Sequence, residues 1–189
     1  MKVRIFYIGV AVLLFSACTT QTPPGYVPTA AQIEQREQQP RVPSPGFKYV
    51  DFVLVEKSQN RMYLMKDGEV VRDYHVALGQ SPIGHKVKEG DNRTPEGRYT
   101  LMFKNPNSKF YRSIMLDYPN ERDKVIAARR GVDPGNHIVI HGQPNEHFGP
   151  YEGVSQAFNW TNGCVAVTNF EMGEIWRLVD VDTPIEIRP

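Results

Sequence analysis

Apolar and polar residues alternate along most of the chain after residue 46, and a period of two is typical of half-buried β-strands. Gly, Pro, Asn and Asp residues separate the alternating runs, and the dipeptide Asp67-Gly68 predicts a tight hairpin between two of them. The predicted strand regions are Tyr49–Lys57, Asn60–Gly79, Gly97–Lys104, Arg112–Pro119, His137–Gly142, 164–168 and 183–188.

Two segments have helical periodicity instead. Glu121–Gly131 begins with acidic residues, ends with two arginines and stops at a glycine, an order that the helix dipole favours. In the second segment, Thr168 and Glu171 have the spacing of a capping box. Its apolar residues then follow the i, i+3, i+4, i+7 spacing of one buried face: Met172, Ile175, Trp176 and Val179. The pattern therefore predicts a mostly β fold with short helices, in the α+β class.

The first 18 residues have the layout of an export signal, with a basic start, an apolar run, small residues and then Cys18. The apolar run is shorter than the roughly 20 residues that a membrane-spanning helix needs. Its ending, Phe-Ser-Ala-Cys, resembles the lipobox of bacterial lipoproteins, in which the cysteine becomes the lipidated first residue. We expect a lipoprotein signal peptide over residues 1–18 and lipidation of Cys18. Ordinary secretion with a free Cys18 is the alternative.

Residues 19–46 have a composition of their own, with six of the fifteen prolines and five glutamines. A segment with so few large apolar residues does not bury enough surface to offset its ordering entropy. We expect a Pro/Gln-rich flexible tether here, followed by one domain over residues 47–189. The formal net charge is +1 and no basic cluster occurs, so nucleic-acid binding is not expected.

The domain contains a single cysteine, Cys164, at the start of a short predicted strand. Thiols in an oxidising compartment are normally paired, and lipidation of Cys18 would leave Cys164 without a partner in the chain. An unpaired thiol in an exported protein is either reactive or engaged with another molecule. A buried cysteine that serves as a small apolar residue is the structural alternative.

A cysteine nucleophile needs a base, and His141 is the best placed of the five histidines. It ends a predicted strand, and one long loop, residues 142–163, joins it to Cys164. A loop of that length is usually functional, and we interpret it as a wall or lid of a site. The alternative is a metal site of His137, His141, His147 and Cys164. Strand residues four apart lie about 13 Å from each other, which does not suit two ligands of one zinc ion.

Gly163 precedes the thiol and allows a tight turn. Acyl transfer needs backbone N–H donors directed at the developing oxyanion, and the amides of Gly163 and Cys164 are the candidates. A plain turn glycine is the alternative.

Together, "IVIHG" and "WTNGCVAVTN" resemble the His…(Ser/Thr)-x-Gly-Cys signature of the L,D-transpeptidase catalytic (YkuD-type) family. Further segments that resemble this family are "LVEKSQNRMYLMKDGEVVRDYHVALGQSP" and "GDNRTPEGRY", and "LDYPNERDKVIAARRG" is similar to the subgroup that carries WTxGC. The resemblance covers about residues 48–188. It implies a β-sandwich or barrel-type catalytic domain and cysteine-dependent acyl transfer on peptidoglycan stem peptides, with no cofactor and no metal.

By motif position, the resemblance makes Cys164 the nucleophile and His141 its general base and acid, with the Gly142 carbonyl orienting the imidazole. Two positions depart from the commoner Ser-His-Gly-Cys-Ile-Arg pattern. Asn162 replaces a histidine, and Ala166 replaces an arginine that would lie near the substrate carboxylate. Substrate choice therefore stays open at this point.

Three functions are compatible with these residues. The first is a transpeptidase that cross-links stem tetrapeptides. The second is an endopeptidase or amidase of the same mechanism, which would cut cross-links or release a wall-linked lipoprotein. The third is a non-catalytic wall-binding lipoprotein. For each we expect the cell envelope, with a lipid anchor in the periplasm on the outer membrane. Candidate substrate contacts, each with a purely structural alternative, are Lys86, Lys88, Arg112, Tyr111 and Trp160.

Overall fold

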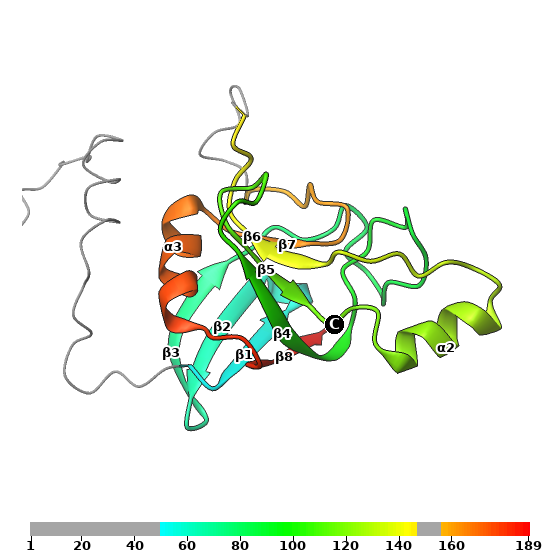
Figure 1. Cartoon of the computed structure of the whole chain (residues 1–189), viewed down its shortest axis with the longest axis horizontal. Coiled ribbons are helices and arrows are strands. Elements are labelled where there is room, and N and C mark those ends of the chain that lie inside the picture. Colours follow the sequence, from blue (N-terminus) through cyan, green and yellow to red (C-terminus); the bar gives the residue numbers. More distant parts are fainter. Residues whose placement is uncertain (1–49, 147–155) are drawn as a thin grey trace, which may run out of the picture. The chain divides into compact units, whose positions relative to one another are not determined.

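The computed structural model describes residues 50–146 and 156–189. Eight strands, two α-helices and one short 3-10 helix form these parts of the chain (Figure 1). The strands are β1 Phe52–Glu56, β2 Arg61–Lys66, β3 Glu69–His75, β4 Gly97–Asn105, β5 Ser113–Leu116, β6 Val139–His141, β7 Val165–Ala166 and β8 Pro184–Arg188. The helices are η1 Lys57–Gln59, α2 Glu121–Arg129 and α3 Asn169–Leu178. The predicted export signal, the predicted tether and residues 147–155 of the loop predicted as a wall or lid lie outside the described residues.

The strands form one mixed sheet in the order β3-β2-β1-β8-β4-β5-β6-β7. The β1–β8 and β6–β7 pairs are parallel, and the other neighbours are antiparallel. β4 takes part in both halves, because its first residues pair with β8 and its later residues pair with β5, on either side of an irregularity between Leu101 and Phe103. An irregularity of this kind bends a strand and lets the sheet curl.

The curled sheet is closed by the segment that follows β3. Ala77 and Ala166 exchange two backbone hydrogen bonds of 2.9 and 2.8 Å, so this segment pairs with β7 at the far edge of the sheet. Thr161 continues the junction, because its amide donates to the Leu78 carbonyl and its carbonyl accepts from the Gln80 amide. The predicted barrel-type architecture is confirmed in this sense: both edges of the sheet meet beside Cys164.

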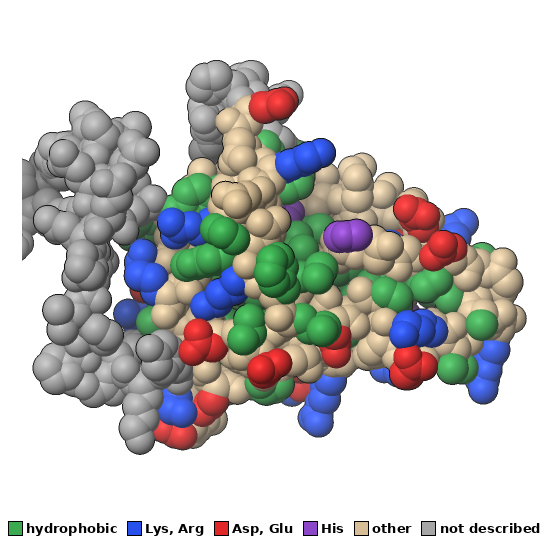
Figure 2. All heavy atoms as spheres, in the orientation of Figure 1, with side chains coloured by type: hydrophobic (Ala, Val, Ile, Leu, Met, Phe, Trp, Pro, Cys, Tyr) green, Lys and Arg blue, Asp and Glu red, His purple; other side chains and the backbone are tan. Residues whose placement is uncertain are grey.

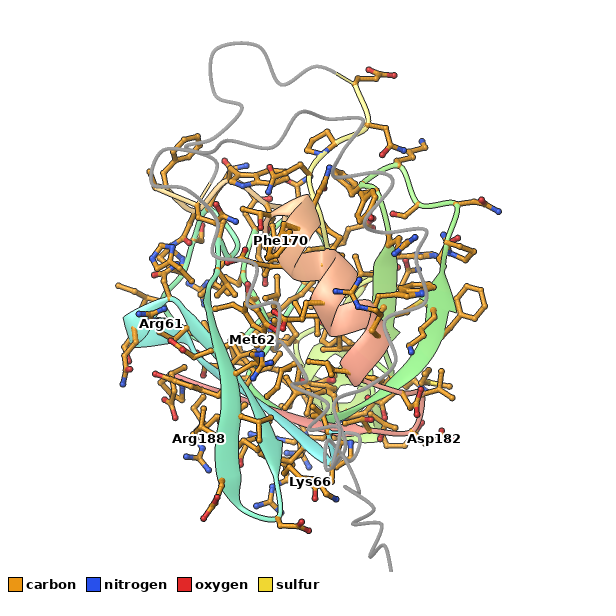
Figure 3. The ribbon with its side chains drawn as sticks, turned by 90° about the vertical axis from the view of Figure 1, so that its left-hand side faces the viewer. Arg61, Met62, Lys66, Phe170, Asp182 and Arg188 are labelled. Atoms are coloured by element: carbon orange, nitrogen blue, oxygen red, sulfur yellow. The ribbon has the colours of Figure 1, made fainter. Side chains whose placement is uncertain are left out.

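In β2, apolar and polar residues alternate because only one face of the strand lies in the core. Met62 and Leu64 are fully buried, whereas their neighbours Arg61 and Tyr63 are half-buried. Figure 3 shows this strand and the adjacent hairpin beside α3. Ile175 of α3 belongs to the same apolar core as the inward residues of the strands, so the helix and the sheet share one interior.

The predicted helix over 168–179 is confirmed with its cap. The Thr168 side chain accepts from the Glu171 amide, and the Glu171 carboxylate accepts from the Thr168 amide. Three of the four residues of its predicted buried face are fully buried, and Trp176 is half-buried. In α2 the cap is Asn120, which forms a capping box with Asp123 that the sequence analysis did not identify. Neither helix in the described part of the chain is long and apolar enough to cross a membrane.

One strand prediction began too early. The region predicted from His137 forms β6 only from Val139, because His137 has a positive φ of 57° and leaves the extended conformation. The surface in Figure 2 carries Lys, Arg, Asp and Glu side chains in a mixed arrangement, in keeping with the net charge of +1.

Candidate active site

A tight turn fixes Cys164 at the start of β7. Gly163 has a φ of +130°, and a Cβ atom at this position would lie 2.6 Å from the carbonyl oxygen of Arg93. The position therefore requires glycine both for its conformation and for the close approach of a neighbouring loop. The Thr161 hydroxyl accepts from the Gly163 amide at 3.1 Å and donates to the Cys164 carbonyl at 2.8 Å. This hydroxyl holds the turn together, and the sequence analysis had not singled it out.

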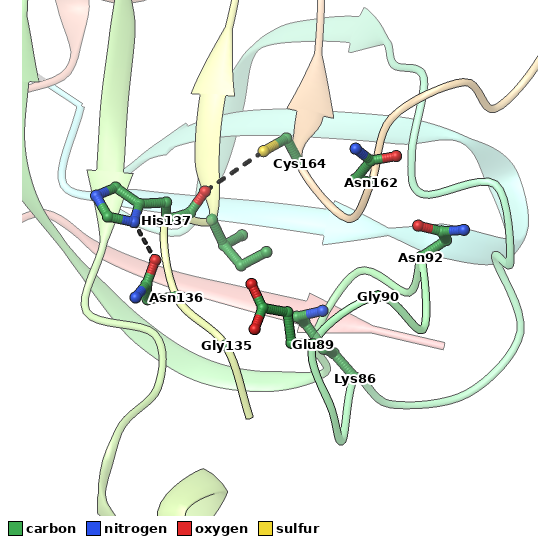
Figure 4. A pocket seen from close by; sticks show the side chains of 10 residues that line it. Lys86, Glu89, Gly90, Asn92, Gly135, Asn136, His137, Asn162 and Cys164 are labelled. Carbon is green, nitrogen blue, oxygen red and sulfur yellow. Dashed lines mark hydrogen bonds between the residues drawn. The ribbon is translucent and has the colours of Figure 1, made fainter. Parts of the chain in front are cut away.

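The thiol of Cys164 is half-buried and opens on a pocket of about 270 Å³. Its Sγ lies 3.6 Å from the carbonyl oxygen of His137, to which it donates (Figure 4). Burial raises the pKa of the thiol, while the Val139 amide and the charge of Lys86 act in the opposite direction. The resting sulfur is therefore a neutral thiol held by a backbone carbonyl.

His141 ends β6 and is 1% exposed. Its Nδ1 lies 2.6 Å from the Gly142 carbonyl oxygen, which can only accept, so Nδ1 carries the proton and Nε2 of the neutral ring has the free lone pair. The ring packs against Phe110 at a centroid distance of 4.4 Å and against Trp160 at 5.6 Å. Burial lowers the pKa of His141 to about 4, although the Gly142 carbonyl acts to raise it. The imidazole is thus neutral, oriented and shielded.

The register of the two parallel strands brings His141 and Cys164 to one face. His141 pairs with Ala166, and Ile140 pairs with Val165. Continued by one residue, this register places Cys164 beside Val139, two residues before His141 on the same face. Spacings of about 3.3 Å per residue and 4.8 Å between strands then put the two Cα atoms about 8 Å apart. That separation lies within reach of a rotating thiol and an imidazole, although the thiol here donates to His137 instead.

Gly142 leaves no room for a side chain, and its carbonyl also orients the imidazole. A Cβ atom there would lie 2.5 Å from Oδ1 of Asn169, at the start of α3. The same oxygen accepts from the Gln143 amide at 2.7 Å, which ties the loop after β6 to the helix. The chain that follows His141 is therefore held against the start of α3.

The loop from Gly79 to Gly97 forms the opposite wall and is held by buried charges. The Asp91 carboxylate accepts from the amides of Val87, Lys88 and Arg93 and from Nζ of Lys86 at 3.0 Å. Burial alone would raise the pKa of Asp91, but these donors outweigh it and hold the pKa below its usual value.

A second buried lysine anchors the same loop. Nζ of Lys57 donates to the carbonyls of Gly84 and Thr94 and to the Glu96 carboxylate at 2.8, 3.1 and 2.7 Å. With two lysines fixed in this way, the loop has a defined course although it has little regular secondary structure.

Of the predicted substrate contacts, Lys86 lines the thiol pocket and is 4% exposed, and Trp160 contacts the ring of His141. Lys88 is exposed and does not line this pocket. Arg112 lies over the rings of Tyr111 and Trp176 at 5.0 and 5.5 Å, on the α3 side.

The two departures from the family motif have different surroundings. Asn162 is exposed at the pocket, where its Oδ1 accepts a long bond of 3.4 Å from Gln80. Ala166 is fully buried between β6 and the Ala77 segment. The Gly163 amide, one of the two predicted oxyanion donors, donates to Thr161 here, so it would have to leave that bond to meet a substrate.

The described residues of the alternative metal site do not share one environment. The exposed ring of His137 contacts Asn136, whereas the ring of His141 is enclosed. Within residues 50–146 and 156–189, no three His, Cys, Asp or Glu side chains are grouped around a common point. His147 of that alternative lies outside the described residues, as does Cys18.

The chain matches the YkuD family, described as the L,D-transpeptidase catalytic domain, over residues 50–187. YafK from Escherichia coli strain K12, named as an L,D-transpeptidase, is 27% identical over 134 residues, which cover 68% of this chain and 46% of YafK. YqjB from Bacillus subtilis strain 168, named in the same way, is 28% identical over 151 residues, covering 77% of this chain and 73% of YqjB.

Among solved structures, the helical cell shape determining protein Pgp2 from Campylobacter jejuni is similar, with 28% identity and a TM-score of 0.54. The match covers 75% of this chain and 48% of Pgp2. Bd1075 from Bdellovibrio bacteriovorus shares the fold at 23% identity and a TM-score of 0.51, covering 77% of this chain and 50% of Bd1075. The chain spans about half the length of YafK and Pgp2.

Proposed function

Because the chain belongs to the L,D-transpeptidase catalytic domain family, we propose that it transfers acyl groups of peptidoglycan stem peptides through a thioester on Cys164. One observation carries the proposal: a thiol that opens on a pocket and an imidazole with a free Nε2 start from neighbouring parallel strands on one face. A nucleophile, a base and a group that orients the base are the parts that covalent acyl transfer needs.

In the first half-reaction, Nε2 of His141 takes the thiol proton while the sulfur attacks the carbonyl at the L-centre of the diamino acid. The oxyanion of the tetrahedral intermediate accepts from the Cys164 amide, and from the Gly163 amide once that amide has left Thr161. The imidazolium then gives its proton to the departing D-alanine amine. The C–N bond breaks and a thioester remains.

In the second half-reaction, His141 removes a proton from the attacking group, and the sulfur leaves and is protonated again. An amine of a second stem peptide gives a cross-link, which is transpeptidation. Water in the same place gives hydrolysis, so an endopeptidase or amidase that opens cross-links or releases wall-linked lipoprotein would use the same residues. The relative named for its role in helical cell shape supports a part in remodelling the cell wall.

The electrostatics favour proton transfer in step with attack. Burial raises the pKa of Cys164 and lowers the pKa of His141, so both groups rest in their neutral forms. A resting thiolate–imidazolium pair would place two charges in a site that disfavours both. The rotation of the thiol from His137 toward His141 would then begin the reaction.

A carbapenem tests the proposal directly, because such an acylating agent would form a stable adduct on an active thiol. Intact-mass measurement should show one adduct on the wild-type protein, none on Cys164→Ala, and slow formation on His141→Gln. The matched control His75→Gln, an exposed histidine on β3, should react like the wild type. Repeated absence of an adduct on folded wild-type protein would refute the proposed nucleophile. Chromatography of treated muropeptides then separates synthesis, which makes new dimers, from cleavage, which releases monomers.

We also propose that the protein works in the periplasm as a lipid-anchored protein of the outer membrane, with Cys18 as the lipidated residue. The export-signal layout and the Phe-Ser-Ala-Cys sequence support this. Membrane fractionation of the wild type and Cys18→Ala tests it, and equal membrane association of both proteins would contradict it.

A further inference from the structure

Another pocket, of about 570 Å³, lies between the loop that borders the thiol pocket and the turn after α2. Three basic side chains line it, those of Lys88, Arg93 and Arg130. Gly90 lines both pockets, but they have no other lining residue in common in the described part of the chain, and Cys164 belongs only to the first. Figure 4 labels Gly90 on the loop that separates them.

The three basic side chains have no counter-ion in the protein. Within the part of the chain that the structure describes, the side chains of Lys88, Arg93 and Arg130 form no hydrogen bond or ion pair. Asp91 is the one acidic residue among the described residues that line the pocket, and its carboxylate accepts from three backbone amides and from Nζ of Lys86. Three positive charges therefore surround a space whose only negative charge is already balanced. An anion in that space would relieve their mutual repulsion.

Backbone contacts hold the walls of this pocket in place. The Asp91 carboxylate accepts from the amides of Lys88 and Arg93 at 3.1 Å each, which fixes two of the three positions on the loop. The amide of Glu89 donates to the Asp133 carbonyl at 2.8 Å, and this bond joins the loop to the segment that follows α2. The cations therefore leave a frame that is already formed, so a ligand would not have to order it.

Arg93 is the most restricted of the three cations. It is half-buried, and its Nη1 lies 3.3 Å from the point where a Cβ atom of Gly84 would be. Its planar guanidinium is therefore packed against backbone, and it loses less rotamer freedom on binding than an exposed side chain does.

Arg130 has a structural alternative, because it is the C-cap residue of α2. Cations near the C-terminus of a helix interact favourably with its dipole. Arg129, the last residue of the helix, has the same charge at the same helix end but does not line the pocket. Comparing these two arginines therefore separates an effect of the helix end from contact with a ligand.

The charges and donors of the pocket suit a phosphate group. A phosphate monoester carries about 1.5 to 2 negative charges at pH 7. The guanidinium groups of Arg93 and Arg130 can each donate two parallel hydrogen bonds to its oxygens, and Lys88 adds a third positive charge. A carboxylate has a single charge and would leave two of the three cations unbalanced.

We propose that this pocket binds a phosphate monoester through Arg93, Arg130 and Lys88. Neither Cys164 nor His141 takes part, so the inference does not depend on the proposed function. A soluble phosphate ester and the headgroup of phosphatidic acid carry the same group, and the experiment below distinguishes these two sources. Such a ligand would attach the domain to a phosphate-bearing component and leave the thiol pocket open.

Titration of the full chain with glycerol 3-phosphate tests the site. The amide NMR shifts are followed while chloride holds the ionic strength constant. We expect saturable shifts at the amides of Lys88 and Val132, with a Kd on the order of 1 mM, because exposed ion pairs are individually weak. Acetate, which has one charge, should bind about tenfold more weakly. No saturation at about ten times the expected Kd, or equal affinity for acetate, would overturn the inference.

Substitutions assign the binding to this pocket. Arg93→Gln should raise the Kd about tenfold, and Arg130→Gln about threefold because Arg130 is exposed. The matched control Arg129→Gln should leave the Kd unchanged, and equal losses in the two α2 variants would overturn the assignment. Arg93→Lys keeps the charge without the planar fork, so its Kd should lie between those of the wild type and Arg93→Gln. The melting temperatures of both Arg93 variants show whether they are folded.

Sedimentation with vesicles identifies the source of the phosphate. Phosphatidylcholine vesicles with and without phosphatidic acid are compared for the wild type and Arg93→Gln, which share residues 1–18, so membrane binding through that segment cancels. If the lipid headgroup is the ligand, phosphatidic acid should increase binding of the wild type several-fold and Arg93→Gln should lose the increase. Equal vesicle binding of both proteins, with saturable binding of glycerol 3-phosphate, assigns the site to a soluble phosphate ester. Failure of both probes would refute the site.

Discussion

Acidification should destabilise the protein through His141. The imidazole is 1% exposed and packed between Phe110 and Trp160, and burial lowers its pKa from 6.5 to about 4. In the unfolded chain the same ring takes up a proton near pH 6.5. Between these two values the unfolded state binds more protons than the folded state, so stability falls as the pH falls. The contribution is fully present above pH 6.5 and is lost by about pH 4.

A pKa lowered from 6.5 to about 4 corresponds to about 3 kcal/mol of unfolding free energy. Urea unfolding, followed by tryptophan fluorescence at several pH values across this window, measures it. Carboxylates also titrate there, so the quantity of interest is the difference between wild type and His141→Gln. That difference should shrink by about 3 kcal/mol as the pH falls, whereas exposed His75→Gln should run parallel to the wild type. Parallel curves for wild type and His141→Gln would show that the ring is not held neutral, and the reasoning would be wrong.

Three further substitutions test the residues that hold the site in place. Gly163→Ala should lower the free energy of unfolding, measured by chemical denaturation, by about 3 kcal/mol, because its Cβ would meet a backbone oxygen. The control Gly68→Ala, also at positive φ but in open space, should lower it by about 1 kcal/mol. Lys57→Met should lower the free energy of unfolding by about 3 kcal/mol, because it leaves two carbonyls and a carboxylate unpaired. The control Lys66→Met removes the more exposed ion pair with Asp51, and its melting temperature should barely move. Thr161→Val should slow adduct formation and cost about 2 kcal/mol, and Thr161→Ser should restore both; equal behaviour of the two variants would contradict the role of the hydroxyl.

Local patterns in the sequence predict most of the elements. The bounds of α3 could be predicted almost to the residue, because its capping box and its apolar face are both encoded within a dozen positions. The strands could be predicted because the alternation of apolar and polar residues is also a local pattern. The Asn120 cap of α2 was available in the same way, since Asp123 stands three residues later, but it was overlooked.

Features that depend on distant contacts could not be predicted. The closure between Ala77 and Ala166 joins residues far apart in the chain, and no local period encodes that pairing. The order of the loop from Gly79 to Gly97 has no local sequence pattern, because it comes from buried lysines and not from apolar spacing. The candidates Cys164 and His141 were identified from their places in the sequence and from the motif, but their burial and the contact of the thiol with His137 required the structure.

The position of β8 sets the order in which the protein can be made. This strand is the last in the chain, yet it lies between β1 and β4 at the centre of the sheet and pairs in parallel with β1. Ribosomes synthesise a chain from its amino end, and contacts between segments far apart in the sequence form slowly. β1 and β4 therefore lack the strand that joins them until residues 184–188 have emerged. A nascent chain that already contains Cys164 still lacks the central strand of its sheet, so the surroundings of this thiol are complete only after β8 has been synthesised.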